Sequence, residues 1–171
     1  MKNHNLLMPP LFVLVVFLAT DSRASEEVNA DFENLKSRLT GSWSFVEENR
    51  AYDATFEKVS HGRALLERNS GFIAVYHPDG GSLLMTLYTR DGNQPRFRAR
   101  GFEENPRSIR FIFQDITNWK SGTEHINGLR IVFKDQDHVV EKWETRQPDG
   151  AKAGFEFELT RKKKASGGNL E

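Results

Sequence analysis

Two closely spaced turn signals between residues 75 and 102 limit most strongly what this chain can fold into. The first is Pro78-Asp79-Gly80-Gly81 and the second is Asp91-Gly92-Asn93. The runs before, between and after these turns alternate apolar and polar residues. Such alternation around tight turns is typical of antiparallel strands joined as hairpins. The stretch therefore predicts three antiparallel strands in succession.

The same alternation continues on both sides of this stretch and predicts the fold class. Strands are expected at residues 42–48, 55–60, 64–69, 72–77, 82–90, 96–102, 108–114, 126–134, 138–146 and 154–161. Nearly all connections between them are short, so neighbours in sequence pair and the chain meanders. Closure of such a meander into a barrel removes its two unpaired edges. The prediction is an all-β fold: a single antiparallel meander β-barrel of about ten strands.

The segment before the first strand predicts an N-terminal α-helix over residues 25–40. Phe32, Leu35 and Leu39 form one apolar stripe at helical spacing, and Gly41 ends the helix. The one longer connection, residues 115–124, contains Trp119 and is expected at an open end of the barrel.

The first residues of the chain resemble a targeting segment. The apolar run at 11–19 is shorter than the roughly 18 residues that a membrane-spanning helix needs, and small residues flank Arg23 as at a signal-peptidase site. We expect a cleaved signal peptide at 1–24, a barrel domain at 25–161 and a disordered basic, Gly/Ser-rich tail at 162–171. A secreted or periplasmic location follows from this division. An uncleaved anchor helix is the alternative.

Composition excludes several classes of function. The 24 basic and 24 acidic side chains cancel, so there is no bulk electrostatic reason to expect binding to nucleic acid or an anionic membrane. Cysteine is absent, which excludes disulfides, thiolate nucleophiles and cysteine-ligated metals. No nucleophile elbow, phosphate loop or paired-carboxylate motif is present, so no cofactor is predicted and a non-enzyme is favoured. Stable membrane insertion is not expected after signal cleavage, and the oligomeric state stays open, a dimer included.

Arginines on one strand face form the first candidate binding site. Arg96, Arg98 and Arg100 lie on one side of their strand, with apolar residues between them. If that side lines the cavity, it would bind a carboxylate or phosphate by charge-assisted pairs. If it faces water, the arginines pair with neighbouring Glu side chains and contribute little. The apolar opposite face favours the second orientation, and Arg96, near a barrel mouth, is the strongest candidate.

Four aromatic residues complete the predicted ligand-binding set: Tyr76, Tyr88, Phe111 and Trp143. The tyrosine hydroxyls either face a cavity or point outward, and Trp143 is expected in the core. Glu141 shares a strand face with Trp143, and if buried it needs a partner, for which an arginine is the natural choice.

The histidines show no metal-site spacing. The four outside the predicted signal peptide are His61, His77, His125 and His138, and no two are two or four residues apart. Each is expected at a turn or barrel rim. His77 and His125 could lie close together at one end of the barrel. Haem iron needs only one proximal histidine. A haem site on His77 or His125 is therefore an alternative.

Longer motifs give the chain a family resemblance over roughly residues 35–161. They are Gly41-Ser42-Trp43, Tyr76 to Gly81, Thr86-Leu87-Tyr88, Gly92 to Arg96, Phe111-x-Phe113-x-Asp115-x-Thr117-Asn118, His125, Asp137-His138 and Trp143. Together they resemble the calycin barrels (lipocalins, fatty-acid-binding and nitrobindin-like proteins), and in particular an uncharacterised bacterial lipocalin-like group. In that family the Gly-x-Trp tryptophan packs across the barrel bottom with a basic side chain. That group often has His where Leu87 stands and Cys where Thr89 stands, so roles tied to those positions are not expected here.

The residues and the resemblance together suggest three functions. The first is a barrel that binds a small hydrophobic or amphipathic molecule with an acidic group. The second is nitrobindin-like haem binding. The third is a filled barrel that acts as an interaction protein.

Overall fold

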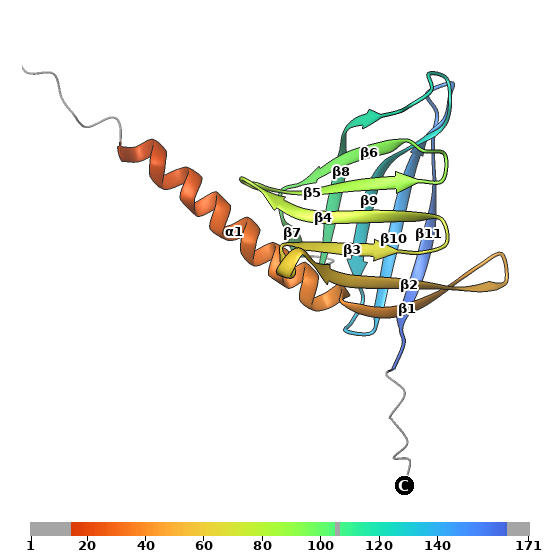
Figure 1. Ribbon diagram of the computed structural model, residues 1–171, viewed down its shortest axis with the longest axis horizontal. Helices are drawn as coiled ribbons and strands as arrows, with labels where there is room; N and C mark the ends of the chain where they lie inside the picture. The colour runs from red at the N-terminus through yellow and green to blue at the C-terminus, as the bar shows by residue number, and fades with distance from the viewer. Residues whose placement is uncertain (1–14, 105–106, 164–171) are drawn as a thin grey trace, which may run out of the picture.

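An antiparallel sheet of eleven strands dominates the protein, with one long helix across one end (Figure 1). The computed structural model describes residues 15–104 and 107–163. The elements are α1 (Val15–Leu39), β1 (Gly41–Glu47), β2 (Arg50–Val59), β3 (Ala64–Arg68), β4 (Phe72–Asp79), β5 (Ser82–Thr89), β6 (Gln94–Ala99), β7 (Phe102–Glu104), β8 (Arg107–Thr117), β9 (His125–Phe133), β10 (His138–Arg146) and β11 (Lys152–Arg161), with a short 3-10 turn at Ser60–Gly62.

Pairing of the first and last strands closes the barrel. Trp43 in β1 lies opposite Arg161 in β11, and Ser44 lies opposite Thr160. The other neighbours in the ring are consecutive in sequence, except that β6 pairs directly with β8. The extra strand β7 pairs only with the beginning of β8. The predicted meander barrel is confirmed, because short turns force sequence neighbours to pair and closure removes the free edges.

Several strand boundaries differ from the prediction, among them the end of β8 at Thr117, and two of the differences have a clear local backbone reason. The strand expected at 96–102 ends at Ala99, because Gly101 has a φ of +144° and turns the chain into β7. β2 begins at Arg50 rather than at residue 55. It does so because Glu48 and Asn49 both adopt positive φ, which makes a two-residue hairpin turn without glycine.

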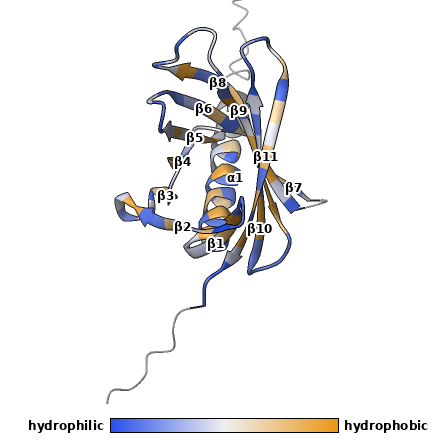
Figure 2. Cartoon of the chain, turned by 90° about the vertical axis from the view of Figure 1, so that its right-hand side faces the viewer, coloured by the Kyte–Doolittle hydropathy of each residue, from blue (hydrophilic) through white to orange (hydrophobic). Residues whose placement is uncertain are grey.

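The helix α1 closes one end of the barrel and fills it. Val28, Phe32, Leu35 and Leu39 are at most 3% exposed and belong to the barrel core. The Lys36 Nζ atom donates a 2.6 Å hydrogen bond to the Gly62 carbonyl in the link between β2 and β3. Figure 2 shows α1 inside the outline formed by the strands. This end of the barrel is therefore plugged by apolar side chains of the helix.

The helix begins at Val15, well before the expected residue 25, and runs through the predicted cleavage site. Within the described part of the chain, no helix is long and apolar enough to cross a membrane. Residues 1–14 of the predicted signal peptide and residues 164–171 of the predicted tail lie outside the described residues. The division at residue 24 stays a prediction.

The first prediction concerns this plug. Leu35→Ala should lower the free energy of unfolding by about 2–4 kcal/mol, because Leu35 is fully buried and its loss leaves a cavity. Urea unfolding followed by circular dichroism measures the change. Ser37→Ala, on the exposed side of the same helix, is the control and should change stability by less than about 0.5 kcal/mol. Equal effects from both substitutions would show that the helix does not pack into the barrel.

Arg161 connects the end of the helix to the seam between β1 and β11. Its guanidinium lies over the Trp43 ring, 4.1 Å from the centroid, and donates hydrogen bonds to the carbonyls of Arg38 and Thr40. The Trp43 indole N–H donates to the Leu39 carbonyl at 2.7 Å. Carbonyls at a helix C-terminus lack partners within the helix, and these two side chains supply them. This is the packing that the family resemblance implies for Trp43.

Candidate functional site

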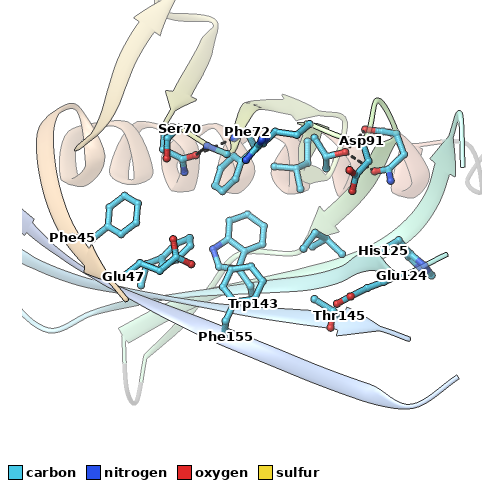
Figure 3. Close-up of a pocket in the computed structure, with 18 residues that line it drawn as sticks. Phe45, Glu47, Ser70, Phe72, Asp91, Glu124, His125, Trp143, Thr145 and Phe155 are labelled. Carbon is cyan, nitrogen blue, oxygen red and sulfur yellow. Dashed lines mark hydrogen bonds between the residues drawn. The ribbon is translucent and has the colours of Figure 1, made fainter. Parts of the chain in front are cut away.

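A pocket of about 540 Å³ opens at the end of the barrel opposite α1 (Figure 3). Its walls come from the ends of β1, β4, β5, β9, β10 and β11 and from the turns between strands. The apolar lining residues are Phe45, Phe72, Leu87, Ile126, Trp143, Phe155 and Phe157, and the polar ones include Glu47, Asn69, Ser70, Thr89, Arg90, Asp91, Asn93, Glu124, His125 and Thr145. The barrel is thus filled at the helix end and hollow at the other.

Aromatic rings in mutual contact form the wall of the pocket. The Trp143 ring meets Phe72 edge-on at 5.0 Å and stacks on Phe155 at 6.3 Å between centroids. Phe157 contacts both Phe155, at 5.2 Å, and Phe45, at 4.6 Å. Alternation along β1, β10 and β11 places these side chains on the inner face. Because the rings pack against one another, the wall is a preformed apolar surface.

The rim of the pocket carries more acidic than basic side chains. Glu47, Asp91 and Glu124 supply carboxylates, whereas Arg90 supplies a guanidinium. His125 also lines the rim, with its ring 5.3 Å from the ring of Trp119. Burial lowers the pKa of His125, which keeps the imidazole neutral at pH 7. The rim is therefore net negative.

Two buried carboxyl groups lie deeper in the barrel than the pocket. Each is two residues along the chain from a residue that lines the pocket, Asn69 or Trp143. Glu67 in β3 is 0% exposed and Glu141 in β10 is 1% exposed. Tyr76 donates a 2.6 Å hydrogen bond from its hydroxyl to Glu67 Oε2, and the Trp143 indole N–H donates to Glu141 Oε2 at 3.2 Å. The Oε1 atom of each carboxyl accepts no hydrogen bond from the described residues. Glu141 is thus joined to the pocket wall through Trp143.

The two carboxyl groups influence each other's protonation. Burial raises the pKa of Glu141 to about 7. Burial, followed by the negative charge of Glu141, raises the pKa of Glu67 well above its ordinary value. Neither carboxyl forms an ion pair with a described residue. The pair therefore retains a proton at neutral pH, because two ionised carboxylates cannot share this interior without a cation.

The predicted arginine site does not face the pocket. Arg96 is exposed on the outer face and forms two hydrogen bonds with the Asp115 carboxylate, at 2.5 and 2.7 Å. Arg98 is also exposed and donates to Ser82 Oγ at 3.1 Å. The inward orientation considered for this strand is wrong, and the solvent-facing alternative is the observed one. The physical reason is that Phe97 and Ala99 take the inner face and are buried.

The structure separates the predicted aromatic residues into three environments. Trp143 lines the pocket. Tyr76 and Phe111 face inward but lie deeper, with rings 5.4 Å apart, and both are fully buried. Tyr88 is 48% exposed and does not line the pocket. The arginine partner expected for a buried Glu141 is also wrong, since the Trp143 indole is its hydrogen-bond donor.

The two histidines considered for haem lie at opposite ends of the barrel. His125 begins β9 at the pocket, whereas His77 is near the end of β4 that points toward α1, with its Nδ1 atom 3.1 Å from the Pro78 carbonyl. The expectation that they could meet is wrong, because β4 and β9 run in the same direction, and His77 is near the end of its strand whereas His125 begins its strand. No group of three metal-ligating side chains occurs among the residues that the structure describes.

The wall residues Phe45, Phe72 and Phe155 were not predicted from the sequence as site residues, and neither was Glu67 beneath the pocket. The signal for Glu67 was present, because Leu65 and Glu67 are two apart in a strand and must share a face. An inward Leu65 therefore places a carboxyl inside. The sequence does not predict that Glu67 lies near Glu141, because β3 and β10 are not adjacent in the barrel.

No protein-family model matches this chain, and no curated protein matches it. The pocket, its aromatic wall and the carboxyl pair beneath it are therefore the features that bear on function.

Proposed function

We propose that this protein is a lipocalin-like barrel, secreted or periplasmic, that binds a small apolar or amphipathic molecule in its open end. The observation that carries the proposal is the preformed pocket of about 540 Å³ with an aromatic wall. A concave, mainly apolar cavity with a few polar groups is the usual form of a small-molecule site. The packing of Trp43 with Arg161 supports the calycin resemblance.

The pocket favours binding over a purely structural role. A filled barrel acting as an interaction protein would have side chains throughout its interior, whereas here a pocket opens at the end opposite α1. The acidic ligand group first considered has little support, because Arg96 and Arg98 face solvent and Arg90 is the single described arginine that lines the pocket. The apolar part of the ligand is therefore the part that the wall supports.

The second prediction tests the aromatic wall. Phe155→Ala should weaken binding of the neutral fluorescent probe N-phenyl-1-naphthylamine about tenfold, because the ring lines the pocket and stacks on Trp143. Fluorescence titration measures the dissociation constant. Ile112→Ala is the matched control, since Ile112 is also a large exposed apolar residue but lies outside the pocket. Absence of saturable probe binding to the unmodified protein, with no small molecule retained in native mass spectrometry, would contradict the proposal.

Haem binding is a second candidate, favoured by one observation. His125 lines the pocket, burial lowers its pKa, and its Nδ1 atom accepts no hydrogen bond from the described residues. A neutral imidazole is the form that binds iron.

The third prediction follows from this placement. If His125 is a proximal ligand, titration with haem should shift the Soret band at one equivalent, and His125→Ala should abolish the shift. His77→Ala should leave it unchanged, because His77 lies at the other end of the barrel. An unshifted Soret band at one equivalent of haem rejects this candidate.

A further inference from the structure

The interior beneath the pocket contains acid without a counter-charge. Glu67 and Glu141 are both almost completely buried, and neither forms an ion pair with a described residue. Tyr76 and Trp143 each donate one hydrogen bond, so each carboxyl keeps one oxygen without a donor among the described residues. A buried acceptor without a donor is costly to a protein. A ligand that brings positive charge and N–H donors would offset this cost.

The pocket floor lies directly above this pair along two strands. Trp143 lines the pocket and is two residues from Glu141 on the inner face of β10, and Asn69, which also lines it, directly follows β3, two residues after Glu67. Two residues of a strand span roughly 7 Å. A charge held at the floor is therefore within strong electrostatic reach of both carboxyls, in an interior that screens poorly.

The wall and the rim favour the same sign of ligand charge. The faces of aromatic rings attract cations, and the wall presents the partly exposed rings of Phe72 and Phe155 on either side of the nearly buried Trp143 (Figure 3). Rim carboxylates at Glu47, Asp91 and Glu124 outnumber the guanidiniums of Arg90, which lines the pocket, and of Arg146, which lies opposite His125. Wall, rim and interior thus all attract a cation and repel a carboxylate.

We propose that the ligand of this pocket is an organic cation, an ammonium group on an apolar body, and that Glu67 and Glu141 provide its counter-charge. The ammonium lies at the aromatic floor beside Trp143, and the apolar body fills the pocket toward the rim. This inference rests on the proposed binding function and specifies its ligand class. An ammonium is opposite in charge to the carboxylate or phosphate that an inner wall of arginines would bind.

Three probes of one chain length test the proposal: octylamine, 1-octanol and octanoate, each titrated by calorimetry into the full protein at pH 8. Alkylammonium groups titrate near pH ~10, as lysine does, so the amine is charged. Octylamine should bind at least tenfold more tightly than octanol, and octanoate should bind most weakly. In Glu67→Gln/Glu141→Gln, octylamine affinity should fall about tenfold while octanol affinity stays unchanged.

A matched double variant controls for net charge. Glu156→Gln/Glu158→Gln removes two carboxylates from the exposed outer face of β11 and should leave the affinity for all three probes unchanged. Equal binding of octylamine, octanol and octanoate by the unmodified protein would overturn the cation inference and leave the binding function standing. If Glu67→Gln/Glu141→Gln loses the binding of both octanol and octylamine, the two carboxyls have a structural role and the inference is overturned. Binding of none of the three probes would overturn both.

Discussion

Replacing Glu141 with glutamine should stabilise the protein at pH 8 by up to about 3 kcal/mol and flatten its stability between pH 4.5 and 7. Burial raises the pKa of Glu141 from 4.5 to about 7, so the folded state holds this proton more tightly than the unfolded chain does. Stability of the unmodified protein therefore falls as pH rises from about 4.5 to about 7, and the contribution of Glu141 is constant above that range. Glutamine cannot ionise and still accepts the hydrogen bond from Trp143.

Urea unfolding at pH 5, 6, 7 and 8 measures this difference. Glu67 and Tyr76 are the other titratable groups with which Glu141 interacts inside the barrel. Glu67→Gln should act in the same direction, because burial also raises the pKa of Glu67. Glu158→Gln, on the exposed face of the neighbouring strand, is the control and should leave the pH profile unchanged. If the free energy of unfolding changes equally with pH in Glu141→Gln and in the unmodified protein, Glu141 is not a buried acid with a raised pKa.

Replacing Arg161 with alanine should lower the free energy of unfolding by about 2–4 kcal/mol. The guanidinium lies on the buried Trp43 ring and donates to the Arg38 and Thr40 carbonyls, so its removal leaves helix-end acceptors without donors and uncovers the ring. Arg161→Lys should recover less than half of this loss, because an ammonium cannot reproduce the planar fork of donors.

Lys162→Ala provides the comparison for the Arg161 substitution. Lys162 follows directly in the chain and forms an ion pair with Asp53, but both side chains are largely exposed. A surface pair of this kind contributes little, so the loss should be below about 1 kcal/mol. Chemical unfolding followed by tryptophan fluorescence measures both variants. If Arg161→Ala costs no more than Lys162→Ala, the Arg161 guanidinium does not hold the helix to the barrel seam.

Much of the barrel could be predicted because its determinants are local. Alternation in β4, β5 and β6 and the short turns at 78–81 and 91–93 define strands and make neighbours pair. The predicted strand ends were wrong where the backbone adopts a positive φ that the alternation of side chains does not indicate. Glu48 and Asn49 make a hairpin turn without glycine, and Gly101 ends a strand that the side-chain pattern continues.

The candidate site was less predictable, because its parts meet only across the barrel. Of the six residues first assigned to ligand binding, Trp143 alone lines the pocket, and the arginines of β6 face solvent. Alternation shows which residues share a face but does not by itself show which face is inside.

The sequence by itself determined the strands, their order and the sets of side chains that share a face, because those depend on turns and on the two-residue repeat of a strand. Only the tertiary structure decided that α1 plugs one end, that the other end is hollow, and that Glu67 and Glu141 lie near each other beneath it. The physical reason is closure. Proximity between β3 and β10 depends on how the sheet curves and pairs β1 with β11, which no local pattern in the chain encodes.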